Sequence, residues 1–248
     1  MYTLKTAGRG EANGQGGQRH TRLRVPLYRQ TTDFTCGACA TLMVWRYFDK
    51  KAKLSRQNEF LVWTETAALP FKFSSPYRIA AFFIKRDLAT QLINEQITAK
   101  ESRAPLECCE IEPADRKLFL DFFNAYNATL KRRIASGIED RTPSLSDIRN
   151  ALIAGSPVIL LVDSYYTLRA RGAREPSHLP HWIVVTGYMD GRFHINDSIH
   201  EPGVKPGKLI LGGRALSQAM DTFRRFGWAP AIITVQPKKA DRSSTRSP

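Results

Sequence analysis

The chain has 248 residues, of which 42% are hydrophobic, and it carries a formal net charge of +14. This length allows a substantial hydrophobic core, and no apolar segment is long enough to span a membrane, so we expect one globular domain without a membrane span. A basic charge favours acidic partners or nucleic acid, but no nucleic-acid recognition motif accompanies it, and we expect a basic surface without specific nucleic-acid binding.

Both ends of the chain differ in composition from its body. Residues 1–24 combine glycines with scattered arginines, and residues 237–248 are rich in lysine, arginine and serine. We therefore expect a disordered arm at 1–24, a single domain at 25–236 and a flexible tail at 237–248. Residues 1–24 also lack the apolar stretch of a secretory signal, so the four cysteines are expected to be reduced thiols in the cytoplasm.

Hydrophobic periodicity predicts helices in the first half of the domain. The run from Ala40 to Phe48 is apolar on nearly every face, which is typical of a buried helix. Capping residues and apolar spacing place further helices after Ser55, after Ser75, from Ala114 to Ser136 with Gly137 at its end, and after Ser144.

The second half of the chain has the pattern of β-strands. Short β-branched or alternating runs occupy residues 158–162, 181–188, 192–197, 208–211 and 231–235, with a helix expected at about 217–226. Asp190-Gly191 is a strong hairpin signal between the second and third of these strands. The connection before His181, including Arg169-Ala170-Arg171, is expected to be a solvated loop. A helical half followed by an antiparallel half predicts an α+β fold.

Cys36 stands where the buried helical run begins. The first turn of a helix presents free backbone N–H groups and a positive dipole end, which favour the thiolate form of a cysteine. A thiolate in this position is a candidate nucleophile, and it needs a base and a third group that orients the base.

The remaining cysteines suggest other roles. Cys39, on the same helix, is expected to point into the hydrophobic core. Cys108 and Cys109 are adjacent, which makes a poor metal chelate, so neither a metal nor a cofactor is expected. The spacing Cys36-x-x-Cys39 also allows a dithiol redox site, as in thioredoxin-like proteins, but that site would follow directly on a strand and none is evident.

The five histidines of the chain are His20, His178, His181, His194 and His200. Among them His181 stands at the start of a hydrophobic strand, a rigid element that ends at the rim of the sheet. A hairpin turn at Asp190-Gly191 makes positions that sum to about 380 face each other, so Asp197 can reach the ring of His181. Asn196 is an alternative orienting group, because Cys-His-Asn triads also exist.

The sequence at these positions resembles a known family. Gln30 with Cys36-Gly37, the segment 181–188 and Asn196-Asp197 are similar to the motifs of the peptidase C39-like family, within the papain-like cysteine proteases. The resemblance implies a papain-like fold, with Cys36 as nucleophile, His181 as base and Asp197 as orienting acid. It further implies that Gln30 and the Cys36 backbone N–H form the oxyanion hole.

The expected function is hydrolysis of a peptide or isopeptide bond through a thioester intermediate, with a peptide or protein as the partner. Two alternatives stay open. The same residues could serve a cysteine-dependent acyltransferase or amidase on a small molecule, or the two cysteines of the helix could form a thiol-disulfide redox site.

Overall fold

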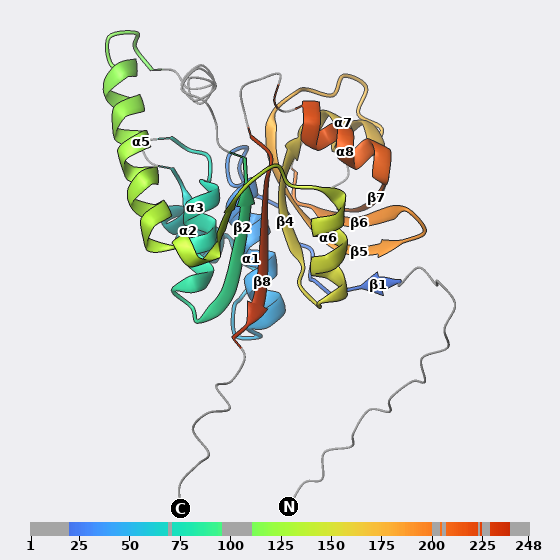
Figure 1. Ribbon diagram of the computed structural model, residues 1–248. Coiled ribbons are helices and arrows are strands. Elements are labelled where there is room, and N and C mark those ends of the chain that lie inside the picture. Colours follow the sequence, from blue (N-terminus) through green and yellow to red (C-terminus); the bar gives the residue numbers. More distant parts are fainter. Residues whose placement is uncertain are drawn as a thin grey trace, which may run out of the picture.

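The computed structural model of the chain describes residues 20–68, 71–95, 111–199, 204, 207–222, 224 and 229–238. An eight-stranded sheet runs through the molecule in the order β3-β2-β8-β4-β5-β6-β7, with β1 paired to β5. Helix α1 passes behind this sheet and helices α6 and α8 lie in front of it (Figure 1). The protein is therefore a mixed α+β protein.

The described helices are α1 (Cys36–Phe48), α2 (Arg56–Thr66), α3 (Pro76–Ile84), α5 (Arg116–Arg133), α6 (Leu145–Ile153), α7 (Ser164–Ala170) and α8 (Gly213–Asp221), with a 3-10 turn at Ala135–Gly137. The strands are β1 (Thr21–Arg22), β2 (Leu88–Asn94), β3 (Ile138–Asp140), β4 (Val158–Asp163), β5 (Pro180–Met189), β6 (Arg192–Asp197), β7 (Gly207–Gly212) and β8 (Ala231–Pro237).

Two hydrophobic clusters cover the two faces of the sheet. On one face, α1 contributes its apolar side chains, among them Leu42 and Met43, to a cluster that includes Trp182 and Val184 of β5. On the other face, α6 and α8 cover Ile183 and Val185 of the same strand. Successive side chains of a strand point to opposite faces, so β5 is buried on both sides and its start is held rigidly.

Three helices begin at the expected serines. Ser55 accepts a hydrogen bond from the backbone N–H of Asn58, as an N-cap should. Ser75 precedes Pro76, the first residue of α3. Ser144 and Asp147 form a reciprocal capping box at the start of α6.

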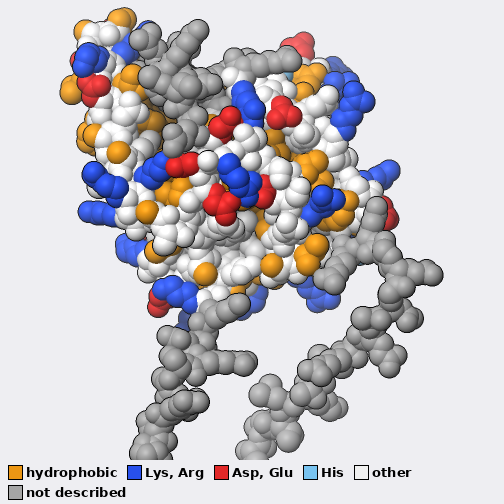
Figure 2. Space-filling view, viewed as in Figure 1, with side chains coloured by type: hydrophobic (Ala, Val, Ile, Leu, Met, Phe, Trp, Pro, Cys, Tyr) orange, Lys and Arg blue, Asp and Glu red, His pale blue; other side chains and the backbone are white. Residues whose placement is uncertain are grey.

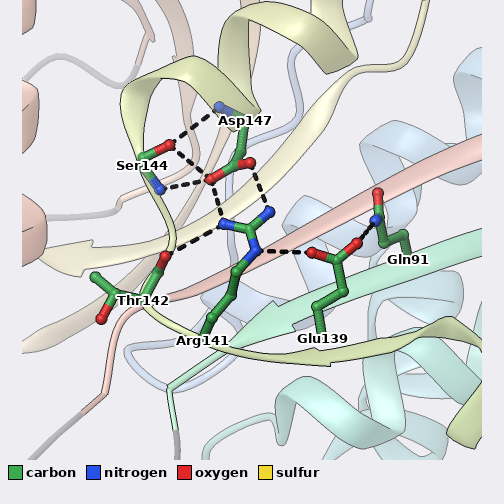
Figure 3. Close-up of polar contacts among 6 residues, drawn as sticks. All are labelled: Gln91, Glu139, Arg141, Thr142, Ser144 and Asp147. Carbon is green, nitrogen blue, oxygen red and sulfur yellow. Dashed lines mark hydrogen bonds and ion pairs between the residues drawn. The ribbon is translucent and has the colours of Figure 1, made fainter.

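The capping box of α6 belongs to a larger polar cluster (Figure 3). Arg141 lies 2.7 Å from Asp147 through Nη2 and 2.7 Å from Glu139 through Nε, and Gln91 of β2 donates to Glu139. The hydrogen bond from Arg141, reinforced by Ser144 against the effect of burial, lowers the pKa of Asp147 to about 2. The cluster ties α6 to the edge strand β3 and its neighbour β2.

Two strands in the middle of the chain, β2 and β3, were not predicted by periodicity. β2 pairs antiparallel with β8 over seven residue pairs and parallel with β3, so the sheet is not antiparallel throughout. In β2 only the last three residues are fully buried, which leaves a weak sequence signal for the strand. Tertiary pairing with the distant β8, and not local pattern, places it in the sheet.

Two expectations about helices were wrong, one for the segment before His181 and one for the start of the last helix. The segment before His181 contains helix α7, capped by Asp163, whose side chain accepts a hydrogen bond from the N–H of Tyr165. Helix α8 begins at Gly213, four residues before the expected start. Within the arm expected at 1–24, Thr21–Arg22 form β1 and pair with Tyr188 and Gly187 of β5.

Helix α5 differs from the other helices in how little of it is buried. Leu130 is its one buried residue, while Leu118 and Phe122 are 69% and 51% exposed. Hydrophobic side chains show on the surface of α5 in the space-filling view (Figure 2). Within the described residues, no helix combines the length and the hydrophobicity needed to cross a bilayer.

Candidate active site

Cys36 is the first residue of α1, at the end of the helix where backbone N–H groups are free. Its side chain is almost covered, with the residue 8% exposed. Gly37 brings this end of the helix close to its neighbours, because a Cβ at that position would lie 2.9 Å from Trp182 Cδ1 and still nearer to Ser74. The nucleophile candidate therefore lies in a tightly packed setting.

The β5–β6 hairpin has the register that the sequence predicted. Val184 faces Asn196 and Val185 faces Ile195, which are positions that sum to 380. Asp190 and Gly191 have φ of 49° and 75°, the positive values that a tight hairpin turn requires. The hairpin brings the end of β6 back to the start of β5.

His181 and Asp197 meet at this end of the hairpin. His181 Nε2 lies 2.7 Å from Asp197 Oδ1, and the two side chains are 4% and 0% exposed. Asn196 points elsewhere, because its Nδ2 donates to the carbonyl oxygen of Val25 at 3.0 Å. Of the two residues that the sequence left open as partners of His181, the structure brings Asp197 to the ring.

The surroundings of Asp197 stabilise its charge. The backbone N–H of Ile199 donates to Oδ1 at 2.9 Å, and Arg171 Nη1 lies 3.1 Å from Oδ2. Burial works against the ionised carboxylate, but His181, Ile199 and Arg171 together outweigh it and lower the pKa of Asp197 to about 2.

The same pairing keeps His181 protonated. Burial alone would lower the pKa of His181, but the charge and hydrogen bond of Asp197, followed by an interaction with the Cys36 side chain, raise it to about 10. Asp197 occupies Nε2, so Nδ1 is the ring nitrogen left for Cys36. The structure thus joins His181 to Asp197 by a hydrogen bond, and the Cys36 side chain also contributes to the raised pKa of His181.

Gln30 is buried and tied to the end of β6. Its backbone N–H donates to the Ser198 carbonyl at 3.0 Å, and its Oε1 accepts from Ser198 Oγ at 3.0 Å. Its Nε2 donates to the carbonyl of Thr32 at 2.9 Å. A primary amide has two N–H bonds, so this contact leaves one N–H of Gln30 for another acceptor.

Two residues near the site carried no signal in the sequence. Arg171, assigned to a solvated loop, has a side chain only 6% exposed and contacts Asp197. Glu59 of α2 is fully buried, and it accepts hydrogen bonds from the Thr31 N–H at 2.8 Å, Tyr28 Oη at 3.0 Å and the Thr35 hydroxyl. Both residues contact partners that are distant in the sequence, and periodicity and motif spacing do not detect such contacts.

The other cysteines and histidines take separate places. Cys39 is fully buried, as expected, and burial together with Glu59 raises the pKa of its thiol. His178 pairs with Asp163 at 2.7 Å, away from the contacts of His181. Cys108, Cys109 and His200 lie outside the described residues. Across the described residues, no group of three or more His, Cys, Asp or Glu side chains is arranged to hold a metal ion.

The fold and the site together define an α+β protein with a cysteine at a helix start beside a buried His–Asp pair. A family model described as the Peptidase_C39 like family matches residues 25–225, and the chain belongs to that family. No curated protein matches the chain.

Two solved structures are similar to the chain at low sequence identity. One is a double glycine motif protease from an AMS/PCAT transporter in complex with the leader peptide, at 11% identity and a TM-score of 0.43, covering 89% of this chain and 100% of the other. The second, described as a C39-like peptidase from Bacillus anthracis, has 11% identity and a TM-score of 0.47, covering 90% of this chain and 100% of the other.

Proposed function

We propose that the protein is a cysteine peptidase of papain-like fold that hydrolyses a peptide or isopeptide bond. Cys36 is the nucleophile, His181 the general base and acid, and Asp197 the group that orients His181. Membership of the Peptidase_C39 like family supports this function. The observation that carries it is the position of His181, which lies 2.7 Å from Asp197 and interacts through its ring with Cys36.

The raised pKa of His181, about 10, supports an imidazolium as the partner of Cys36 at neutral pH. The Cys36 sulfur attacks the carbonyl carbon of the substrate and gives a tetrahedral oxyanion. The intermediate collapses as its C–N bond breaks, and the imidazolium passes its proton to the leaving amine. His181 then takes a proton from water, whose oxygen attacks the thioester carbonyl carbon. The C–S bond breaks, the Cys36 sulfur leaves as the thiolate beside the His181 imidazolium, and the carboxylic acid product releases its proton to solvent.

Gln30 and the Cys36 backbone N–H form the oxyanion hole in this proposal. The N–H of Gln30 that is not donated to Thr32 supports the assignment, as does the pair of hydrogen bonds that fixes Gln30 to Ser198. In comparable sites, one such donor contributes on the order of 3 kcal/mol to the transition state. Gln30→Ala should therefore lower kcat by about 10²-fold with a small change in KM.

The redox alternative is weakened by two observations. No strand directly precedes Cys36 among the described residues, and Cys39 is fully buried beside Glu59, which raises the pKa of its thiol. A resolving or attacking thiol needs exposure and a stabilised thiolate, and Cys39 has neither.

The test combines alkylation with isotope incorporation. Wild type, His181→Ala and Cys36→Ala are treated with limiting iodoacetamide at mildly acidic pH and analysed by intact mass. We expect one fast adduct on Cys36 in wild type, slow labelling in His181→Ala, and no fast adduct in Cys36→Ala. Slow labelling of wild type that does not respond to His181→Ala would overturn the proposal.

Hydrolysis is distinguished from acyl transfer by incubating the enzyme with a proteome-derived peptide library in H₂¹⁸O. A peptidase incorporates one ¹⁸O atom into each new C-terminal carboxylate, and Cys36→Ala yields no new termini. New amides without ¹⁸O would assign the chain to acyl transfer.

A further inference from the structure

A groove of about 920 Å³ lies beside the N-terminal segment, at the β5–β6–β7 end of the sheet. One wall is formed by residues 22–26, and the floor by β6 and β7. The backbone of Leu23 donates to the Thr186 carbonyl at 2.7 Å, and Asn196 Nδ2 binds the carbonyl of Val25. These hydrogen bonds fix the wall of the groove against the sheet.

Close approach of the wall to β5 depends on a glycine. A Cβ on Gly187 would lie 2.5 Å from the carbonyl oxygen of Thr21 and 3.1 Å from Cα of Arg22. The absence of a side chain at this position lets β1 pair with β5 and sets Arg22 beside His194, whose pKa is lowered by burial and by Arg22.

The groove is positively charged. Arg22, Arg24 and Lys208 line it and are exposed, and no Asp or Glu is among its lining residues. Within the part of the chain that the structure describes, none of these three cations lies within 4 Å of a carboxylate. Three uncompensated cations around one concave surface attract an anionic ligand.

The floor adds apolar contacts and an open strand. Lys208 and Ile210 stand two residues apart on β7 opposite Asn196 and His194, so they share one face, and Ile210 is 51% exposed. Among the described strands, β7 is the last in the sheet order. A cationic and an apolar side chain, side by side on one face of an edge strand, fit an extended polypeptide better than a compact phosphate group.

We propose that this groove binds an extended acidic segment of the polypeptide substrate, at a site separate from Cys36. The proposal rests on the proposed peptidase function. The groove includes Asn196, the neighbour of Asp197, and its wall continues along the chain towards Gln30. A substrate whose acidic segment occupies the groove is therefore held on the same strand that carries the orienting acid.

Binding is measured with the full-length Cys36→Ala variant, which lacks the proposed nucleophile and therefore does not cleave the peptide probe. Fluorescein-labelled (Glu-Val)₄, (Gln-Val)₄ and (Lys-Val)₄ peptides are titrated by fluorescence anisotropy at 50 and 300 mM NaCl. We expect (Glu-Val)₄ to bind at least tenfold more tightly than (Gln-Val)₄ at the lower salt, with the difference reduced at the higher salt. No measurable binding of (Lys-Val)₄ is expected.

The variant Arg22→Glu/Arg24→Glu/Lys208→Glu should lose at least tenfold in affinity for (Glu-Val)₄. A matched control, Lys51→Glu/Lys53→Glu/Arg133→Glu, reverses three exposed cations outside the groove and changes the net charge equally. Retained affinity in this control supports the groove, and equal loss in both variants overturns it. The corresponding Gln variants at Arg22, Arg24 and Lys208 give a milder change if charge reversal unfolds the chain.

Competitors decide the class of ligand. Inorganic triphosphate or a single-stranded RNA that displaces (Glu-Val)₄ at equal concentrations of charge would overturn the assignment to an acidic polypeptide. Because binding is measured without turnover, loss of peptidase activity and loss of the groove's affinity are separate results. If the wild type is an active peptidase but Cys36→Ala does not bind (Glu-Val)₄, the groove inference is wrong and the proposed peptidase function stands.

Discussion

Asp197 receives charged partners from two different elements, since its Oδ1 lies 2.7 Å from His181 Nε2 and its Oδ2 lies 3.1 Å from Arg171 Nη1. His181 is the second residue of β5 and Arg171 directly follows α7, so the carboxylate of Asp197 joins the sheet to the end of that helix. A buried carboxylate with two cations stays ionised, and an ionised Asp197 stabilises the imidazolium of His181.

Asp197→Asn removes this charge with little change in volume. The pKa of His181, about 10 in the wild type, should fall, because Asp197 is the main influence that raises it against burial. We expect the rate of Cys36 alkylation at pH 6 to 8 to decrease and kcat to fall by at least about 10²-fold. The pH dependence of iodoacetamide labelling reports the change, and an unaltered profile would remove Asp197 from the proposed triad.

The same pair predicts how stability depends on pH. Because the pKa of His181 is raised from 6.5 to about 10 in the folded protein, its contribution is complete below pH 6.5 and disappears as pH rises towards 10. The pKa of Asp197 is lowered from 3.8 to about 2, so its contribution is present above pH 3.8 and disappears as pH falls towards 2. The free energy of unfolding should therefore be greatest between about pH 4 and 6.5.

Urea titrations followed by tryptophan fluorescence measure this dependence, with His181→Gln as the comparison. The variant should lose less stability than the wild type between pH 6.5 and 10. It lacks the imidazole of His181, whose deprotonation over this range lowers the free energy of unfolding of the wild type. Curves that run parallel over that range would show that His181 has the same pKa in the folded and unfolded chains.

Arg171 can be tested against a neighbouring arginine. Arg171→Gln removes a cation from the buried carboxylate of Asp197, and we expect a loss of about 1.5–3 kcal/mol in the free energy of unfolding. Arg169→Gln is the matched control, since Arg169 is exposed and contacts the ring of Tyr165. Equal stability of the two variants would mean that the Arg171–Asp197 contact contributes nothing measurable.

Local patterns in the sequence predicted the parts of the site that form locally. The apolar run after Cys36 is helix α1, and the register of the β5–β6 hairpin follows from the Asp190-Gly191 turn. Both depend on residues close together in the chain, where side-chain period and turn chemistry decide the structure.

Contacts between distant segments could not be predicted in this way. β2 joins β8 across more than a hundred residues, and Arg171 reaches Asp197 only because α7 forms where a loop was expected. Glu59 likewise joins α2 to the segment before Cys36, and nothing in the spacing of a single glutamate reveals a buried acceptor. Packing between distant segments determines these contacts, and local patterns in a single sequence do not predict such packing.

Glu59 should be important for the shape of the segment that leads into Cys36. It accepts hydrogen bonds from Tyr28, Thr31 and Thr35, so Glu59→Ala leaves buried donors without an acceptor and should cost about 3 kcal/mol or more. Tyr28→Phe removes one of these donors and should cost about 1 kcal/mol. Thermal unfolding measures both, and equal losses would contradict a shared role of Glu59 across the segment.

Gly37→Ala tests whether the start of α1 must lie close to its neighbours. The added Cβ would meet Ser74 and lie 2.9 Å from Trp182 Cδ1, so the end of the helix that carries Cys36 has to shift. We expect a loss of about 1–3 kcal/mol in stability and a slower alkylation of Cys36. Gly207→Ala is the control, because no heavy atom of the described residues lies within 4 Å of a Cβ at that position. Wild-type alkylation in Gly37→Ala would show that the Cys36–His181 contact tolerates movement of the helix, and the tight packing at Ser74 would then serve stability alone.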